Sequence, residues 1–478
     1  MIGGGLAGLS SAIALADAGC RVSLIERRPH LGGRATSYSL PDGTEIDNCQ
    51  HVTLGCCTNL ADFYRRVGAE DKIRFYDRLD FVDAQGRIST MEASPLPPPL
   101  HMAPSFLLFS ILTLRDKRAI GAAMFAIARS AGAPPGIEGI SMLDWLCRMK
   151  QTPSAIARFW RVVLVSALDE ELDRTEAKYG IEVFWKAFLS NKTGYRVGIP
   201  SVPLADLYEG CRDAIVRQGG EVRVRSSVRR VQTEAGRFAF ATLDGGSQIY
   251  ADACIVAVPH DVLFNILPDA ARNDPALRGL DRIRTSPITG VHLWFDRVVM
   301  QEPFLTLLDH TTQWIFNKSL LSEAAETNHA AGRLTNGPVE ALHSGNTQYL
   351  QLVISASYDL LPKSRQEITD LCMREIAEVL PAAREARLLK ATVVKEVNAT
   401  FSPEPGVDRW RPGHQSVIGN LFYAGDWTRT GWPATMEGAV RSGYLAAESL
   451  LTSFGQPRNF VRADLPLEGL CKFWAERR

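Results

Sequence analysis

The hydrophobic pattern at the start of the chain predicts most of a βαβ unit. Apolar residues recur at helical spacing over residues 6–18, and Gly19 follows as a natural helix end. Residues 21–25, Arg-Val-Ser-Leu-Ile, are then typical of a short buried strand. Because only two residues precede the glycine-rich turn at residues 3–8, the first strand is expected either to be unusually short or to begin upstream of Met1.

The rest of the chain alternates between helical and strand-like segments. Residues 95–104 are rich in proline and mark a linker or the exit from the first domain. Helices are predicted over 102–131, 141–190, 203–218, 364–379 and 434–454, and strands over 221–225, 228–233, 237–243, 248–251, 253–258, 290–295, 349–356 and 421–425.

Composition and charge narrow the function classes. The 478 residues call for two or three domains, and 46% hydrophobic with 22% charged residues is ordinary for a globular protein. Lys plus Arg equals Asp plus Glu at 53 each, so no global basic field exists for nucleic acid. The sequence lacks a signal-peptide pattern and an uncharged apolar run of about 18 residues.

The nine cysteines are scattered and form no C-x-x-C pair, which is typical of reduced thiols in a cytosolic protein. Cys56 and Cys57 are interpreted as neighbouring thiols rather than a vicinal disulfide. We predict no metal site.

The turn at residues 3–8 has the spacing of a dinucleotide-binding loop. Gly3 would permit the tight turn, Gly5 the close approach of a pyrophosphate, and Gly8 the packing of helix against strand. The helix start and its dipole would stabilise the diphosphate. Glu26 ends the next strand, where a carboxylate binds ribose hydroxyls and repels a 2′-phosphate, so the ligand is FAD or NAD rather than NADP.

Two further motifs suggest contacts with the same ligand. Gly32-Gly33-Arg34 would bring backbone and a guanidinium close to a phosphate. Near the C-terminus, a short strand leads to Gly425-Asp426, and Pro433 precedes a second helix start at residues 434–439. A helix N-terminus there would stabilise the anionic reduced form of a flavin.

These motifs together resemble the amine oxidase and phytoene desaturase superfamily of FAD enzymes. The likeness covers nearly the whole chain and implies that residues 251–259 return to the FAD domain and that Val228 meets the adenine. The implied FAD-binding residues are Gly3, Gly5, Leu6, Ala7, Gly8, Glu26, Arg27, Gly32, Gly33, Arg34, Val228, Gly425, Asp426, Thr435, Met436 and Ala439.

The fold implied by this resemblance is α/β, with a Rossmann-type FAD-binding domain interleaved with a mixed α+β substrate domain. Residues 1–94, 200–285 and 400–455 are expected to form the FAD-binding domain. Residues 95–199 and 286–399 would form the substrate domain, with a helical part facing a membrane, and residues 456–478 a C-terminal tail.

Two longer stretches give a narrower resemblance. Residues 47–59 and 424–441 are similar to those of the bacterial squalene-associated FAD-dependent desaturases, the hydroxysqualene dehydroxylases of hopanoid biosynthesis. Members of that family reduce hydroxysqualene to squalene and water with electrons from reduced FAD. The resemblance therefore implies a hydrophobic triterpenoid substrate, while the electron donor for FAD stays unknown; no second dinucleotide motif for NAD(P)H is present.

Such a reaction needs an acid for the departing oxygen and a dry pocket that tolerates a carbocation. The candidate acids are Asp47, Cys49 and His51, although these residues could equally cap a turn, fill the core or bind a backbone carbonyl. Trp427 and Trp432 are candidates to shield the cation.

A squalene-type substrate also implies contact with a bilayer. Residues 102–114 carry no charge and are followed by Arg115, Lys117 and Arg118, which suits shallow insertion with cations at the headgroups. The alternative is a buried helix of the substrate domain. The expected location is cytoplasmic, peripheral on the inner face of the cytoplasmic membrane.

The sequence is also compatible with other functions. An oxidative isoprenoid desaturase or a flavin amine oxidase would use the same FAD site, and a prenyl-binding chaperone could use the fold without flavin. Glu26, Gly32-Gly33 and Gly425-Asp426 favour a working dinucleotide site over the chaperone.

Overall fold

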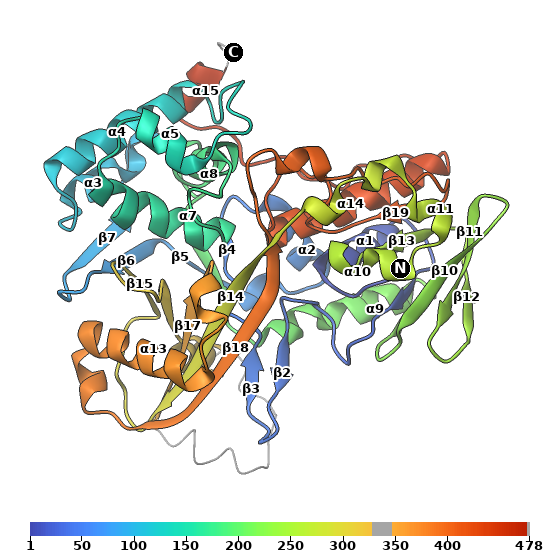
Figure 1. Ribbon diagram of the computed structural model, residues 1–478, viewed down its shortest axis with the longest axis horizontal. Helices are drawn as coiled ribbons and strands as arrows, with labels where there is room; N and C mark the ends of the chain where they lie inside the picture. The colour runs from blue at the N-terminus through green and yellow to red at the C-terminus, as the bar shows by residue number, and fades with distance from the viewer. Residues whose placement is uncertain (327–346, 476–478) are drawn as a thin grey trace.

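A parallel sheet organises the N-terminal lobe of the computed structural model, which describes residues 1–326 and 347–475 (Figure 1). Ile2 pairs with both Ile25 and Val256 through parallel bridges, so the first strand is a single bridge between two neighbours. The resulting order is β9, β1, Ile2, β13, β19, and these strands are β1 (Ser23–Ile25), β9 (Glu221–Arg223), β13 (Cys254–Val256) and β19 (Leu421–Tyr423).

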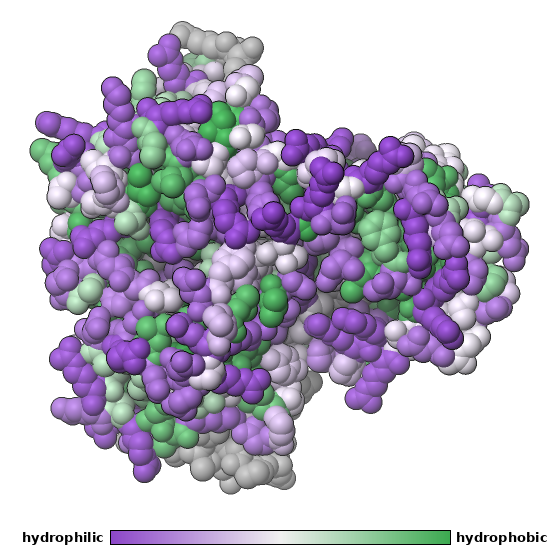
Figure 2. All heavy atoms as spheres, in the orientation of Figure 1, coloured by the Kyte–Doolittle hydropathy of each residue, from purple (hydrophilic) through white to green (hydrophobic). Residues whose placement is uncertain are grey.

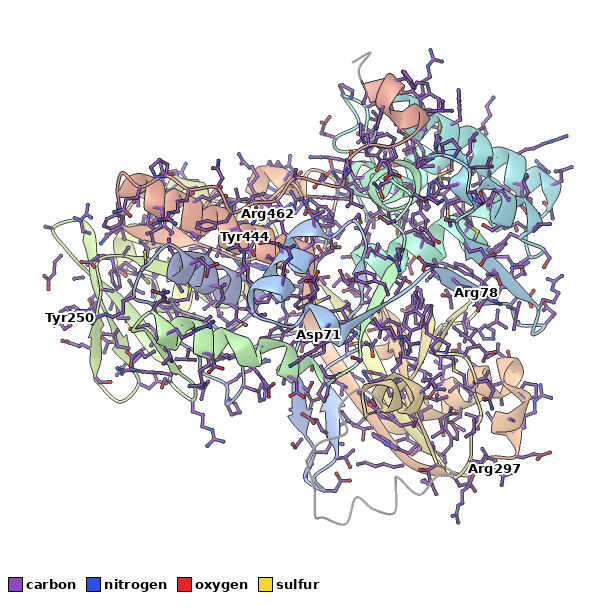
Figure 3. The ribbon with its side chains drawn as sticks, turned by 180° about the vertical axis from the view of Figure 1, so that it is seen from behind. Asp71, Arg78, Tyr250, Arg297, Tyr444 and Arg462 are labelled. Atoms are coloured by element: carbon purple, nitrogen blue, oxygen red, sulfur yellow. The ribbon has the colours of Figure 1, made fainter. Side chains whose placement is uncertain are left out.

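Helices from distant parts of the sequence cover this sheet. The first helix is buried from Leu6 to Ala16 because it lies between the sheet and the last long helix. These helices are α1 (Leu6–Asp17), α2 (Thr58–Arg66), α9 (Glu209–Arg217) and α14 (Met436–Ser453). Asp62 on α2 accepts hydrogen bonds from Tyr444 at 3.0 Å and Arg462 at 2.9 Å, which ties α2 to α14 and to the C-terminal segment (Figure 3).

A β-meander extends from the outer end of this lobe (Figure 1). It consists of β10 (Val228–Glu234), β11 (Arg237–Leu243) and β12 (Gln248–Tyr250), and is followed by α10 (His260–Ile266) and α11 (Asp269–Arg272). These strands agree with the sequence prediction.

A second, seven-stranded sheet lies in the order β18-β14-β17-β16-β15-β6-β7. Its longest pair, β14 and β18, is antiparallel from Thr285 opposite Phe401 to Phe295 opposite Leu388. The elements are β6 (Arg78–Val82), β7 (Ile88–Glu92), β14 (Thr285–Phe295), β15 (Phe304–Leu307), β16 (Trp314–Asn317), β17 (Gln348–Ile354) and β18 (Leu388–Phe401), with α12 (Lys318–Glu326) and α13 (Arg365–Val379).

This sheet bears on the expected domain boundaries. Strands β6 and β7 fall within residues 1–94. However, they pair with each other, and β6 also pairs with β15 of the second sheet. The chain therefore leaves the FAD-binding lobe before Arg78, earlier than the sequence indicated. The boundary was expected at residue 94 because the proline-rich stretch begins there. In the structure, this stretch connects β7 to the helical lobe. Residues 327–346 of the expected substrate domain, and 476–478 of the tail, lie outside the described residues.

Two small antiparallel sheets complete the strands of the structure's described residues. They are the hairpin of β2 (Ser37–Ser39) and β3 (Glu45–Asp47), and the sheet of β4 (Thr53–Leu54), β8 (Val197–Pro200) and β5 (Ile73–Tyr76).

The third part is a helical lobe that packs beside β6 and β7 (Figure 1). Two π-helical turns, Ile156–Trp160 and Phe184–Leu189, interrupt its helices. The helices are α3 (Ala103–Leu108), α4 (Leu114–Arg129), α5 (Met142–Arg148), α6 (Pro153–Ala155), α7 (Arg161–Leu168), α8 (Ala177–Val183) and α15 (Leu470–Ala475). In the described parts of the chain, none of the helices has both the length and the hydrophobicity of a transmembrane segment.

The uncharged run at residues 102–114 is not one continuous helix, which corrects the sequence prediction. Helix α3 ends at Leu108, and α4 begins after Thr113, whose side chain forms a capping box with Asp116. Phe109 is buried, whereas Leu107 and Leu108 are exposed. The run therefore contributes to the core and to the surface.

Candidate active site

The glycine-rich turn has the geometry of a diphosphate cradle. Gly3 has φ +103°, and a Cβ on Gly8 would lie 2.0 Å from the carbonyl oxygen of Gly3. A side chain at either position is therefore excluded. A Cβ on Gly5 would meet nothing closer than 3.8 Å, so this glycine leaves open space for a ligand. No side chain caps α1, so the first N–H groups of the helix remain available to an anion.

Glu26 holds two backbone segments at the rim of this cradle. Its carboxylate accepts hydrogen bonds from the Gly4 N–H at 2.6 Å and from the Arg28 N–H at 2.7 Å. The side chain is buried and lines the same cavity as Gly5. This is the position at which the sequence predicted a ribose-binding carboxylate.

Arg34 connects the two motifs that the sequence suggested separately. Its guanidinium donates to Asp426 Oδ2 at 2.8 Å and to the carbonyl oxygen of Ala399 at 2.5 Å. The structure therefore pairs Arg34 with Asp426, where the sequence predicted that Arg34 would neutralise a phosphate. Gly425 precedes Asp426 with φ +153°, and a Cβ there would lie 2.2 Å from Trp427 Nε1.

These groups surround one long cavity of about 650 Å³, within the roughly 300–1,000 Å³ usual for cofactor sites. It runs from the glycine-rich turn past Val228 to the start of α14. Of the predicted cofactor-binding residues, Gly8 does not line it, because Gly8 packs against Gly3. The lining includes Gly3, Gly5, Leu6, Ala7, Glu26, Arg27, Gly32, Gly33, Arg34, Val228, Gly425, Asp426, Thr435, Met436 and Ala439.

A second cavity of about 230 Å³ meets the first at the start of α14. Thr435 and Met436 line both cavities, and so does Ala167 on α7. Most of the second lining is apolar and comes from the helical lobe and the seven-stranded sheet, with Val183, Phe188, Leu79, Phe81, Trp314 and Phe316 among its members. This cavity has the character of a pocket for a hydrophobic substrate.

Asp47 does not line either cavity, although the sequence proposed it as an acid. Its carboxylate pairs with Lys318 Nζ at 2.8 Å and accepts a hydrogen bond from Ser37 at 2.6 Å. Burial alone would raise the pKa of Asp47, but the ammonium and the hydrogen bonds outweigh it and lower that pKa below its ordinary value. Asp47 is therefore an ionised structural anchor between β3 and α12.

Cys49 and His51 do line the cofactor cavity, but neither is a ready proton donor. Burial raises the pKa of the Cys49 thiol to about 12. Burial lowers the pKa of His51, and its hydrogen bond to the carbonyl of Cys49 opposes this only in part. His51 Nδ1 lies 2.9 Å from that carbonyl oxygen, so Nδ1 carries the hydrogen and Nε2 of the neutral ring can only accept one.

The two predicted tryptophans occupy different positions. Trp427 lines the cofactor cavity and donates through Nε1 to the carbonyl of Val258 at 2.9 Å. Trp432 lines the apolar cavity, with the Arg441 guanidinium 4.9 Å and the Lys186 ammonium 5.7 Å from its ring centroid. Trp432 therefore already interacts with cations of the chain itself.

Sequence reasoning missed Asp169, which lines the cofactor cavity and follows Ala167 by two residues. It follows α7 in the left-handed conformation, with φ 53° and ψ 37°, and its side chain is only 4% exposed. Burial raises the pKa of Asp169 well above its ordinary value, against the opposing hydrogen bonds from Ala356 and Thr400. No local motif marks this residue, because Thr400 is 231 positions away.

Comparison with known proteins identifies the family. The model of the flavin-containing amine oxidoreductases matches residues 6–451. The chain belongs to this family. The 15-cis-phytoene desaturase of Solanum lycopersicum is 28% identical over 95% of this chain and 77% of its own length. That of Synechococcus elongatus is 27% identical over 94% of both chains.

A solved oxidoreductase from Methanosarcina mazei superposes with a TM-score of 0.70 at 17% identity, over 92% of this chain and 97% of its own. The expected fold class is therefore confirmed. Membership of the family makes the chain an FAD-dependent oxidoreductase, and its open glycine cradle, uncapped helix start and cavity size fit FAD. In the described residues, no group of three or more His, Cys, Asp or Glu side chains is arranged to hold a metal.

Proposed function

We propose that this flavoenzyme reduces hydroxysqualene to squalene and water. The observation that carries the proposal is the apolar cavity that opens onto the FAD cavity at Ala167, Thr435 and Met436. A long hydrocarbon could lie in the apolar cavity with one functional carbon at the junction, in a site from which water is largely excluded. Bound FAD, when reduced, would supply the hydride.

The two stretches behind the narrower resemblance support this proposal because they meet in space. The Asn59 amide donates to Glu437 Oε1 at 2.9 Å, and the Leu60 N–H donates to Glu437 Oε2 at 2.7 Å. Residues 47–59 and 424–441 therefore contribute to one structural unit at the edge of the apolar cavity, which both Cys57 and Glu437 line.

An oxidative isoprenoid desaturase is the second candidate, favoured by the phytoene desaturases among the relatives. Both activities need an apolar cavity beside FAD, but they move electrons in opposite directions. The test is therefore anaerobic mixing of holoenzyme with substrate. Reduced enzyme and hydroxysqualene should regain the absorption of oxidised flavin at about 450 nm, while oxidised enzyme and 15-cis-phytoene should keep it. Bleaching by phytoene, without reoxidation by hydroxysqualene, would favour the desaturase.

A squalene-type substrate would reach the enzyme from a membrane. We therefore propose in addition a bilayer-binding surface on the helical lobe. Leu107, Leu108 and Leu114 are 62%, 82% and 63% exposed, and Arg115 and Arg118 are exposed beside them. Figure 2 shows hydrophobic residues between hydrophilic ones at the surface of this lobe. Leucines that enter the acyl boundary next to cations at the headgroups are typical of peripheral membrane proteins.

Replacement of Leu107 and Leu108 by serine should weaken binding to anionic vesicles at least roughly tenfold, because each leucine contributes about 1.5–3 kcal/mol when buried. FAD content should not change. Vesicle sedimentation at low and high salt measures the effect, and salt should release part of the parent protein. The control is Leu389→Ser with Val397→Ser, which removes exposed apolar side chains from β18. Equal sedimentation of both double variants would place membrane binding elsewhere.

A further inference from the structure

We propose that Asp169 is the proton donor for the departing hydroxyl group of the substrate. This inference rests on the proposed function and names a residue for its acid step. The residue lines the cofactor cavity and follows α7, whose Ser166 and Ala167 line both cavities. Its carboxyl group is bonded to the N–H of Ala356, the residue after Ser355, which also lines both cavities.

The position of Asp169 is fixed by its surroundings. Its Oδ1 accepts a hydrogen bond from the Ala356 N–H at 2.8 Å, and its Oδ2 lies 2.8 Å from the Thr400 hydroxyl. The backbone N–H of Asp169 donates to the carbonyl oxygen of Val165 at 2.9 Å, in the last turn of α7. An aspartate in the left-handed region costs energy relative to glycine. The packing thus maintains a conformation that holds the carboxyl group in the wall of the cavity.

The electrostatic surroundings favour the protonated form of this carboxyl group, because they raise the pKa of Asp169 well above its ordinary value. Burial disfavours the charged form most strongly, and the adjacent Glu170 adds to this effect. The hydrogen bonds from Ala356 and Thr400, and Arg34, oppose it only in part. The Cys49 thiol lines the same cavity, and burial raises its pKa to about 12. Among the described residues that line the FAD cavity, Asp426 is the other carboxyl group on this side, and its pairing with Arg34 makes it an unsuitable acid.

The Asp169 proton moves to the hydroxyl oxygen, the C–O bond breaks with both electrons on oxygen, and water leaves. The carbon is then reduced by the two electrons of the hydride named in the proposed function. The Asp169 carboxylate regains a proton from solvent before the next turnover. Thr400 can stabilise the transient carboxylate, because its hydroxyl already donates to Oδ2.

The test compares Asp169→Asn with the parent holoenzyme on two substrates. Asparagine tolerates the left-handed conformation and keeps an oxygen for the Ala356 N–H, so folding and FAD content should be retained. With hydroxysqualene, the anaerobic reoxidation rate should fall about 10²–10⁴-fold. With the phosphate ester of hydroxysqualene, whose leaving group departs without added protonation, the rate should fall far less. Asp173→Asn, at an exposed position four residues further on, is the control.

Two further readouts separate an acid from a structural residue. The parent rate with hydroxysqualene should fall as pH rises through the raised pKa of Asp169, and this limb should be missing in the Asn variant. The infrared spectrum of the parent should contain a protonated-carboxyl band that is lost in Asp169→Asn.

Equal losses on both substrates, or an unchanged rate with hydroxysqualene, would overturn the role of Asp169. If the parent itself does not reduce hydroxysqualene, the proposed function fails, while the infrared band still reports whether Asp169 is protonated.

Discussion

Replacement of Glu26 by alanine should yield a folded protein that purifies with little or no FAD. The carboxylate would bind two ribose hydroxyls, and each charge-assisted hydrogen bond contributes roughly 1.5–3 kcal/mol. Loss of both corresponds to an affinity at least about 100-fold weaker. The substitution also frees the Gly4 and Arg28 N–H groups, which Glu26 holds at 2.6 and 2.7 Å, so the cradle itself should loosen.

The flavin-to-protein absorbance ratio measures this effect, and circular dichroism checks the fold. Glu234→Ala is the matched control, because Glu234 is an exposed glutamate on β10 outside the cavity. Full FAD occupancy in Glu26→Ala would show that the ribose is bound by other groups.

Replacement of Ala167 by phenylalanine should stop turnover while FAD remains bound. Ala167 lines both cavities at their junction, where an aromatic ring would fill the space expected for the reacting carbon. Misplacement of the reacting carbon by even about 1 Å can lower the rate about 10²-fold, so a larger loss is expected here.

Ala167→Val should give an intermediate loss, because it narrows the junction without closing it. Ala382→Phe adds the same ring at an exposed position and should have parental activity. If Ala167→Phe kept its FAD and parental activity with hydroxysqualene, the substrate would have to reach FAD by another route.

Local spacing is the basis of the cofactor site that the sequence predicts. Gly3, Gly5, Glu26 and Gly425 belong to short motifs whose roles follow from backbone geometry within a few residues, and all four line one cavity. Helices with clear periodicity, such as Arg365–Val379, were also predicted within a residue or two.

Long-range pairing explains most of what the sequence did not reveal. Strand β18 has no regular alternation of buried and exposed positions, and its partner β14 lies about a hundred residues earlier, so its length of 14 residues was missed. The surroundings of the buried aspartates depend on long-range contacts in the same way. Asp47 is bound by Lys318, 271 positions away, and Asp169 gains its environment from Ala356 and Thr400.

The most direct test of the proposed reaction is a single turnover without oxygen. Holoenzyme reduced by dithionite, freed of excess reductant, is mixed with a small excess of hydroxysqualene, and the extracted products are analysed by mass spectrometry. We expect squalene in an amount equal to the reduced FAD, with no squalene from oxidised enzyme. Absence of squalene from the reduced enzyme, together with conversion of squalene or phytoene to a more unsaturated product by the oxidised enzyme, would contradict the proposed function.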